Sequence, residues 1–505
     1  YPSVTLTGLD YALSIQKTDG EIINYSTETL RTWFQKRDSS FNLMFDDEDS
    51  ARAAAETYKN AMLEKGDTLL GERVSLIPQP QASVVIIDQH TGYVKAIIGG
   101  RGTKTASLTL NRATETRRQP GSTFKIVSTY APALDDQDMT LATVFDNAPY
   151  NYTNGVPVNN WAGSNAYTGL TTIREAIAGS INVVAVKCLT RITPRLGFEY
   201  AEDLGISTLY DDESLDVRQP LALGGITDGV VNIELCDAYA TIANGGKYNE
   251  AKFYSRIEDS QGNVLIDNTP EEKTVLKDST AFLLTQAMMD VMKSGGTASD
   301  VSIGEMPIAG KTGTTSDDRD IWLAGYSPYY TCSVWGGYDN HDTLPSGDIY
   351  HTYHKKLWTA IMSRIHENLP VRQFEQPDSV ETAYVCKKSG LLAVDGVCTG
   401  DPRGSMAYTE YFAKGTTPTK SCDVHTAVKV CSSTGLLPTA TCTTTTKIFV
   451  KRPAGSEGTT EDSAYAPPSA TCKGHNILDK ITNDQIQLIV NTPRGKKGTT
   501  DDSYI

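Results

Sequence analysis

The sequence lacks any apolar run that could cross a bilayer. Its longest uninterrupted apolar pieces are short, as at 84–87 and 183–186, whereas a membrane-spanning helix needs about 18 or more apolar residues. We therefore expect no membrane-spanning segment within the 505 residues. The chain begins with Tyr1, without the basic and apolar regions of a signal peptide, so we expect a signal or membrane anchor upstream of it.

Basic residues are fewer than acidic residues. Lys and Arg number 46 against 61 Asp and Glu, which gives a formal net charge of -15 and a sequence pI near 5.0. Clustered Lys and Arg are needed to bind phosphate backbones, and no such cluster stands out, so nucleic acid is not an expected partner. Hydrophobic residues at 39% and charged residues at 21% are ordinary for folded proteins, which excludes a chain that is disordered as a whole.

The length predicts about three domains. Strand candidates occur early, at 83–88 and 93–98, and late, at 321–326 and 330–335, with helical patterns between them. This arrangement predicts an α+β fold in which both ends of the main domain share one sheet. The expected units are a leader or linker subdomain at 1–80, a main domain at 81–370, two cysteine-containing repeats at 371–427 and 428–480, and a polar tail at 481–505.

Three short motifs follow one another in the main domain: Ser-Thr-Phe-Lys at 122–125, Ser-Ile-Asn at 180–182 and Lys-Thr-Gly at 311–313. The first two are weak alone, because accidental copies of the same patterns occur at 14–17 and 40–42. Lys-Thr-Gly occurs once, and a chance copy is expected in roughly one chain in eight of this size. The ordered set is much rarer, and it is the set found in class A β-lactamases and penicillin-binding proteins.

Ser122 is the candidate nucleophile. A helical pattern begins near it, so its oxygen would lie at a helix N-terminus, where unpaired N–H groups and the helix dipole favour negative charge. Residues three apart share one helix face, so Lys125 can reach the Ser122 hydroxyl. An ordinary lysine is a poor base at neutral pH, but burial and a neighbouring cation both lower its pKa. We expect Lys311 to be that cation.

Over about residues 80–370 the chain resembles the transpeptidase part of class A (bifunctional) penicillin-binding proteins. The likeness extends to segments around the motifs, among them Asn111-Arg-Ala113, Arg118-Gln-Pro-Gly121, Leu223-Gly-Gly225 and Asp320-Ile-Trp322. It implies a penicillin-binding-protein/β-lactamase-like α+β fold with an antiparallel sheet flanked by helices. That family carries a glycosyltransferase domain ahead of the transpeptidase, and residues 1–80 are too short for one, so we expect that domain upstream of this chain.

The resemblance implies an acyl-transfer role for each motif residue. Ser122 would attack the carbonyl between the two terminal D-alanines of a peptidoglycan stem peptide and release the last D-alanine. Lys125 would accept the serine proton, and Ser180 would relay a proton to the leaving amine. Asn182 would hold the substrate amide and the Lys125 side chain. β-Lactams would acylate the same serine as mimics of the dipeptide.

The third motif is implied to bind substrate. Lys311 and the hydroxyls of Thr312 and Thr314 would hold the substrate carboxylate through charge-assisted hydrogen bonds. Gly313 and Thr315 complete the expected substrate-binding segment. The backbone N–H groups of the nucleophile and of Thr314 would form an oxyanion hole. No cofactor and no metal ion is expected.

The implied reaction is D,D-transpeptidation at the extracytoplasmic face of the cell membrane. A β-lactamase is disfavoured, because that family carries a deacylating Glu in a Glu-x-x-x-Asn pattern, which does not occur between Asn182 and Lys311. Ile181 also replaces the Asp of the lactamase motif. A D,D-carboxypeptidase and a non-catalytic penicillin sensor or cell-wall-binding domain stay as alternatives.

Cysteines divide into two groups. Cys188, Cys236 and Cys332 stand singly in apolar segments and are expected to be buried as small hydrophobic residues. The other six lie beyond residue 380 and form a repeat with two histidines. Its members are Cys386, Cys398, Cys422 and His425, and then Cys431, Cys442, Cys472 and His475.

Three interpretations of this repeat are open. One disulfide per repeat, joining Cys386 to Cys398 and Cys431 to Cys442, is favoured because an extracytoplasmic location supports disulfides. Cys-x2-His has the spacing of zinc ligands, but ligands spread over 36 or more residues weaken a zinc site; free thiols are the third interpretation. Resemblance to accessory modules of this enzyme family implies contact with cell-wall polymer or with a divisome or elongation partner, and a passive spacer is the alternative.

Overall fold

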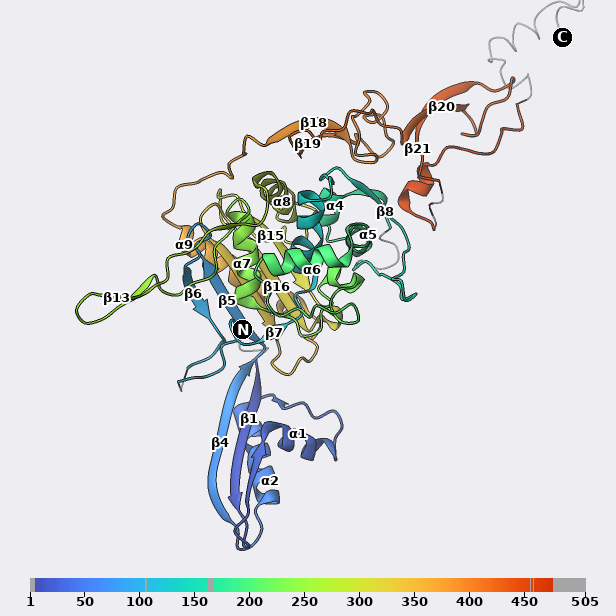
Figure 1. The fold of residues 1–505 in the computed structure, drawn as a ribbon. Helices are drawn as coiled ribbons and strands as arrows, with labels where there is room; N and C mark the ends of the chain where they lie inside the picture. The colour runs from blue at the N-terminus through green and yellow to red at the C-terminus, as the bar shows by residue number, and fades with distance from the viewer. Residues whose placement is uncertain (1–4, 105–106, 162–166, 455, 457, 476–505) are drawn as a thin grey trace, which may run out of the picture.

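The structure is a computed structural model that describes residues 5–475, apart from 105–106, 162–166, 455 and 457. Figure 1 shows a small N-terminal unit, a large central domain and two small modules toward the C-terminus. No helix in the described part of the chain combines the length and apolarity that a bilayer crossing requires. The predicted tail at 481–505 lies outside the described residues.

The N-terminal unit is a four-stranded antiparallel sheet with two helices packed on it. Its elements are β1 (Leu6–Gln16), β2 (Ile22–Ser26), β3 (Met44–Phe45), β4 (Thr68–Gln79), α1 (Thr27–Gln35) and α2 (Glu48–Met62). Buried side chains of β1 and both helices form a separate core. The sequence pattern predicts a strand at 5–15 and helices at 28–35 and 49–65 in this unit, and β1, α1 and α2 confirm them. β4 was missed because its first half is exposed and shows no apolar alternation.

The central domain is built around a five-stranded antiparallel sheet. In sheet order its strands are β15 (Ala309–Thr314), β16 (Asp320–Tyr326), β17 (Thr331–Gly337), β5 (Gln81–Ile87) and β6 (Val94–Ile98). The three inner strands are buried along their whole length. Early and late segments therefore share one sheet, which confirms the predicted α+β fold.

Helices pack on this sheet and beside its β15 edge (Figure 1). The helices in contact with sheet strands are α7 (Asn232–Ala243), α8 (Asp278–Val291) and α9 (Asp348–His366). A further group comprises α3 (Ala131–Asp135), α4 (Ile173–Ala178), α5 (Asn182–Ile192) and α6 (Pro194–Asp203). One hydrophobic core runs through both groups and includes Trp322, Trp335 and Trp358. The three motifs therefore sit where the sheet edge meets the helical group.

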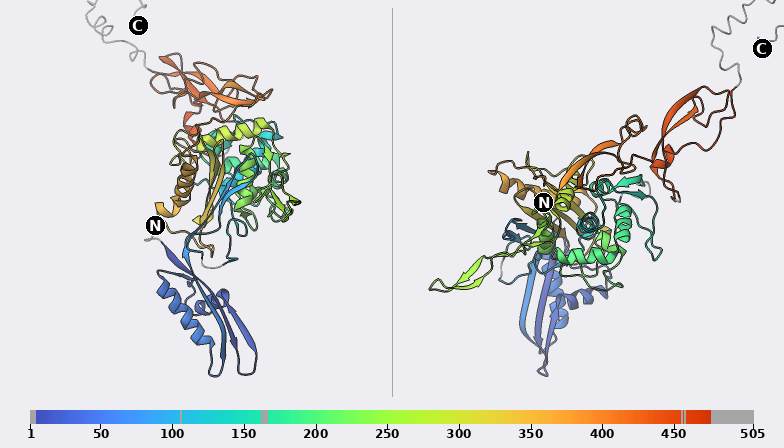
Figure 2. Two further views of the ribbon diagram at one scale, coloured as in Figure 1. Left: turned by 90° about the vertical axis from the view of Figure 1, so that its left-hand side faces the viewer. Right: turned by 45° about the horizontal axis from the view of Figure 1, so that its top comes forward.

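Short strand pairs complete the domain. They are β7 (Arg117–Arg118) with β10 (Val230–Val231), β8 (Val144–Asn147) with β9 (Gly169–Thr172), β11 (Lys247–Tyr248) with β14 (Lys273–Thr274), and β12 (Arg256–Glu258) with β13 (Val264–Asp267). The β12–β13 hairpin projects away from the domain in Figure 1 and in the right-hand view of Figure 2.

Each C-terminal module contains one antiparallel hairpin. The hairpins are β18 (Val380–Cys386) with β19 (Ala407–Ala413), and β20 (His425–Cys431) with β21 (Thr444–Val450). Both first strands end in the same turn: Gly390 N donates to Cys386 O and Gly435 N to Cys431 O, each at 2.8 Å. The two glycines have φ values of 71° and 72°, a region that favours glycine. The sequence repeat is therefore also a structural repeat.

Buried charges join the first module to the central domain. Glu410 on β19 is fully buried and pairs with Arg174 on α4 at 2.6 Å. Asp462, in a short 3-10 helix, is also buried and pairs with Lys388 of the first module at 3.0 Å. Asp462 also accepts a hydrogen bond from Leu170 N of the central domain at 2.7 Å. It therefore contributes a buried carboxylate to this junction, from a stretch whose polar composition predicts an exposed loop or linker.

Candidate active site

Ser122 lies where the chain enters a helical segment. Gly121–Thr123 forms a 3-10 turn, and π-helical turns at Ile126–Tyr130 lead into α3. Ser122 is partly exposed, while the helix behind it is buried. The predicted position of Ser122 at the start of a helical segment is confirmed.

One indole and one phenol group hold the backbone on either side of Ser122 through hydrogen bonds. Trp322 Nε1 donates to Gln119 O at 2.8 Å, and the Tyr239 hydroxyl donates to Thr123 O at 2.8 Å. Gln119 and Thr123 flank Ser122 in the sequence, while Trp322 lies on β16 and Tyr239 on α7, both buried in the core. These two hydrogen bonds therefore tie the backbone around Ser122 to β16 and to α7.

β15 passes directly beside this turn because both segments carry glycine at the contact. Gly121 has a φ of 54°, and a Cβ at this position would lie 2.8 Å from Thr314 O and 3.1 Å from Thr314 N. A Cβ on Gly313 would meet Pro120 O at least as closely. The resulting close approach brings the backbone of Ser122 next to that of Thr314, where the predicted oxyanion hole would be.

Lys125 is fully buried, and its amine contacts the second motif. Its Nζ donates to Ser180 O at 2.7 Å, to Asn182 Oδ1 at 2.6 Å and to Ser180 Oγ at 3.2 Å. Within the described residues, the Ser122 hydroxyl forms no hydrogen bond, so it is not bonded to Lys125 in this state. Hydrogen bonds between catalytic groups are often long or absent without substrate and tighten in the substrate complex.

Lys311, on β15, contacts the hydroxyl of Ser180. Its Nζ donates to Ser180 Oγ at 2.9 Å and to Thr312 O at 3.1 Å, and the side chain is fully buried. The hydroxyl of Ser180 therefore lies within hydrogen-bond distance of two lysine amines. This contact joins the three motifs through their side chains.

Burial makes both lysines weaker bases than usual. Desolvation lowers the pKa of Lys125 well below its ordinary value, and the neighbouring Lys311 lowers this pKa further. Burial lowers the pKa of Lys311 to about 7. Because a buried site penalises the charged ammonium, neutral amine is accessible near neutral pH in this cluster.

The second motif is held in a strained backbone conformation between α4 and α5. Ser180 has a φ of 53°, a region that costs energy for a residue with a side chain. Asn182 Nδ2 donates to Asn159 O at 2.7 Å, which leaves the Asn182 oxygen directed at Lys125. This amide therefore orients the lysine through a fixed hydrogen bond.

Asn160 is a supporting residue that the sequence analysis missed. Its Oδ1 accepts hydrogen bonds from Asn182 N at 3.0 Å and Val183 N at 3.2 Å, at the N-terminus of α5. Ile181, at the N-cap position of α5, provides no side-chain cap. An uncapped helix start was the available signal, but the sequence alone does not show which distant residue supplies the cap.

The threonines of the third motif have different surroundings. Thr312 Oγ1 shares a hydrogen bond with Thr297 Oγ1 at 2.7 Å, and Thr315 Oγ1 accepts from Asp320 N at 2.9 Å. Thr314 is exposed. Of the three hydroxyls, that of Thr314 is the most open to a substrate, and the substrate-binding roles of all three stay predictions.

The expected disulfides of the C-terminal repeats are not formed. All nine cysteines are free, and Cys188, Cys236 and Cys332 are buried as predicted. The two pairs expected to be bonded, Cys386 with Cys398 and Cys431 with Cys442, instead belong to larger groups that each contain a third cysteine and a histidine. The folding of each hairpin and its following loop brings these residues together, which their separation in the sequence had obscured.

The sheet, the helices and the joined motifs are the architecture of penicillin-binding transpeptidases. Residues 82–365 match the family model of the penicillin binding protein transpeptidase domain, and residues 376–427 match that of the penicillin-binding protein 1A C-terminal domain. The chain belongs to the penicillin-binding protein transpeptidase family.

Curated relatives and solved structures agree with this assignment. The chain is 37% identical over 384 residues to penicillin-binding protein 1A of Clostridium botulinum (strain Hall), an alignment that covers 74% of this chain and 46% of the relative. Penicillin-binding protein 1A of Clostridium novyi is 34% identical over 426 residues, covering 82% and 48%. The chain thus spans about half the length of the curated relatives it matches. The structure of penicillin-binding protein 1A from Haemophilus influenzae has a TM-score of 0.59 at 20% identity, covers 82% of this chain and 64% of that chain, and supports the fold.

Proposed function

We propose that this chain is a serine D,D-transpeptidase that cross-links peptidoglycan stem peptides outside the cytoplasmic membrane. The observation that carries the proposal is the contact of Lys125 and Lys311 with the Ser180 hydroxyl, beside the turn that holds Ser122. Membership of the transpeptidase family supports the reaction class. β-Lactams would acylate Ser122 in place of the substrate.

Lys125 has the surroundings that a neutral amine requires. Ser180 O and Asn182 Oδ1 can only accept hydrogen bonds, so a neutral amine would give them its two hydrogens, and its lone pair would remain for a hydroxyl proton, with Ser180 Oγ 3.2 Å away. That lone pair would take the proton of Ser122 as Oγ forms a bond to the substrate carbonyl carbon. The negative charge that develops on the carbonyl oxygen would be held by the backbone N–H groups of Ser122 and Thr314.

Ser180 would return the proton. Its hydroxyl lies 3.2 Å from Lys125 Nζ, so it would pass a proton from the charged lysine to the departing amine. The carbon–nitrogen bond then breaks, D-alanine leaves with that proton, and the acyl group stays on Ser122. An amine of a second stem peptide would attack the ester, and the same groups would act in reverse to release the cross-linked product and restore the hydroxyl.

Lys311 would bind the terminal carboxylate of the donor peptide. Its side chain is buried, whereas Thr314, three residues further along β15, is exposed, and a carboxylate accepting from both groups would balance the charge of a protonated Lys311. A bound carboxylate would favour the protonated form of Lys311 by adding an adjacent negative charge. Substrate binding would thus hold Lys311 charged while Lys125 acts as the base.

An exchange assay tests the proposal. The chain is incubated with a donor peptide ending in D-Ala-D-Ala and with a D-amino acid acceptor, and mass spectrometry measures the exchanged product. We expect exchange for the wild type, loss of more than about 1000-fold for Ser122→Ala, and no loss for Ser14→Ala, which alters the accidental copy of the same motif. Hydrolysis without exchange would indicate the carboxypeptidase, and stable acylation by penicillin without either reaction would indicate the sensor; both results contradict the transpeptidase.

A further inference from the structure

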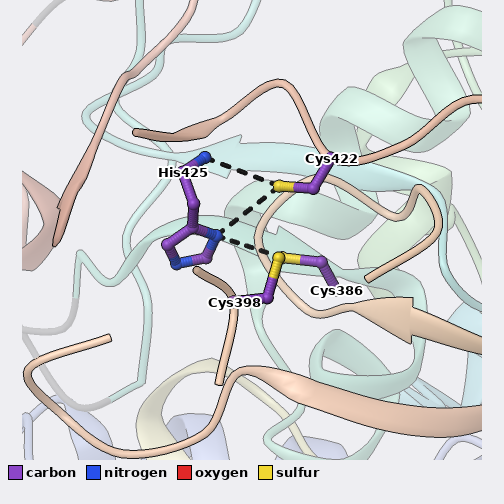
Figure 3. A group of neighbouring side chains, drawn as sticks. All are labelled: Cys386, Cys398, Cys422 and His425. Carbon is purple, nitrogen blue, oxygen red and sulfur yellow. Dashed lines mark hydrogen bonds between the residues drawn. The ribbon is translucent and has the colours of Figure 1, made fainter. Parts of the chain in front are cut away.

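Three cysteines and one histidine of the first module point toward one place (Figure 3). The sulfurs of Cys386, Cys398 and Cys422 and one ring nitrogen of His425 all lie within 4.8 Å of one another. His425 Nδ1 is 3.3 Å from Cys386 Sγ and 3.6 Å from Cys422 Sγ. Ligands at the corners of a tetrahedron, with bonds of about 2.3 Å to sulfur and 2.0 Å to nitrogen, are about 3.5 to 3.8 Å apart. The four atoms therefore have the spacing of a four-coordinate metal site.

The second module repeats this arrangement. Cys431, Cys442, Cys472 and His475 form a group that meets the same 4.8 Å limit. Here the other ring nitrogen faces the sulfurs: His475 Nε2 lies 3.0 Å from Cys431 Sγ and 3.6 Å from Cys472 Sγ. The same donor set is thus assembled twice, with loops of different length between the second and third cysteines. An accidental gathering of thiols would not be expected to recur in this way.

We propose that each C-terminal module binds one zinc ion through three cysteine thiolates and one histidine, and that the two ions hold the modules folded. Cys3His is a structural donor set of zinc, and thiolate ligands select zinc over magnesium or calcium. With four protein ligands the site is closed, so its role is structural and not catalytic. A disulfide would use only two of the three sulfurs and would leave one thiol and the histidine unexplained.

Backbone donors in the first module are arranged for thiolates. Each of its three sulfurs accepts one backbone N–H, at 3.3 to 3.5 Å, from Lys388, Val394 and His425 respectively. Hydrogen bonds to sulfur stabilise negative charge on it. Three such donors converging on three neighbouring sulfurs match a cluster in which a cation balances the thiolates.

A buried carboxylate orients the histidine of this group. Asp401 Oδ2 lies 2.9 Å from His425 Nε2, and both side chains are fully buried. If Nε2 donates to Asp401, Nδ1 presents its lone pair to the three sulfurs. A carboxylate behind a histidine ligand is the usual outer contact of zinc sites, because it fixes the ring and its tautomer. Arg403 holds Asp401 in turn, through two hydrogen bonds of 2.9 Å.

The second module has little apolar core to stabilise it. In the second module the buried apolar cluster consists of the three cysteines themselves, with Leu436 packed against it. Such small units usually need a disulfide or a metal ion in place of a large hydrophobic core. β20 begins with His425, a ligand of the first group, and ends with Cys431, a ligand of the second. The two proposed ions would therefore anchor both ends of one strand.

Zinc content tests the proposal directly. The full chain is purified under reducing conditions, freed of loose metal by dialysis, and analysed by inductively coupled plasma mass spectrometry. We expect two zinc ions per chain in the wild type, one in Cys422→Ser, one in Cys472→Ser and none in the double variant. Cys332→Ser, which removes a buried cysteine outside the modules, should retain two.

X-ray absorption at the zinc edge of the wild type adds a test that does not depend on variants folding. We expect three sulfur neighbours at about 2.3 Å and one nitrogen at about 2.0 Å. The proposal is overturned if the chain stays free of zinc after incubation with zinc chloride, or if the ions have only nitrogen and oxygen neighbours. It is also overturned if native protein purified without reductant is metal-free and lighter by two hydrogens per module, which indicates disulfides.

Discussion

The amines of Lys125 and Lys311 share one partner, the hydroxyl of Ser180, at 3.2 and 2.9 Å. Both lysines are fully buried. Two ammonium groups this close in a buried site repel each other, and burial penalises each of them. We therefore expect that the two amines are not both in the charged ammonium form near neutral pH. The neutral amine supplies a base without a carboxylate or histidine partner.

Removing one amine should change the basicity of the other. In Lys311→Gln we expect the apparent pKa of the base to rise, because the neighbouring cation that lowers the pKa of Lys125 is gone. The measurement is the acylation rate of Ser122 by a saturating β-lactam across pH. Lys247→Gln, which removes an exposed lysine elsewhere on the domain, serves as the control, and a wild-type profile in Lys311→Gln would contradict the coupling.

Stability should depend on pH through Lys311. Its pKa is about 7 in the folded chain and about 10.4 when unfolded, so between these values the unfolded chain binds more protons. The cost of burying this lysine is therefore complete below pH 7 and declines as pH rises toward 10.4. Compared with Lys311→Met, the wild type should gain free energy of unfolding between pH 7 and pH 9 in denaturant titrations. Parallel curves for the two proteins would show that the buried amine does not titrate in this window.

Loss of the Asn160 side chain should affect both folding and acylation. Asn160→Ala removes the cap of α5, which typically costs about 1 kcal/mol, and it frees Asn182 from the position that orients Lys125. We expect a lower melting temperature and an acylation rate reduced about tenfold. Asn159→Ala is the matched control, because Asn159 contributes its backbone carbonyl and its side chain is exposed. Equal effects of the two substitutions would contradict the role given to Asn160.

The ion pair between the first module and α4 should contribute to stability. Glu410→Ala leaves the guanidinium of Arg174 mostly buried, with Asp290 as its remaining charged partner and Gln286 O as a further acceptor. Removing one partner of a buried ion pair costs about 3 kcal/mol of stability. Thermal unfolding should therefore begin at a lower temperature, and the first module should become sensitive to protease. Glu375→Ala, at an exposed position before β18, should change neither property. Unchanged protease resistance in Glu410→Ala would show that other contacts dock the module.

Local patterns predicted much of this structure because periodicity and motif order depend on short stretches of chain. The sheet strands near both ends of the main domain, the helices between them and the convergence of Lys125, Ser180, Asn182 and Lys311 are confirmed by the fold. What was missed depends on tertiary contacts. The capping by Asn160 comes from a loop remote from α5 in sequence, and β4 has little apolar alternation.

The C-terminal repeats are a second case in which the sequence did not show which residues meet in the folded chain. Residue spacing identified Cys422 and His425 as a pair and revealed the repeat. It could not show that Cys386, at the end of β18, and Cys398, in the loop after it, reach the same point. Long loops close at modest cost in entropy, so separation along the chain was poor evidence against a shared site.

The identity of the reactive oxygen is the central claim, and mapping a β-lactam adduct tests it most directly. The chain is incubated with a fluorescent penicillin, digested, and the labelled peptide is located by mass spectrometry. We predict a single adduct on Ser122, absent in Ser122→Ala and slowed severely in Lys125→Ala, in which the proposed base is removed. An adduct on any other residue, or undiminished labelling of Ser122→Ala, would contradict the account.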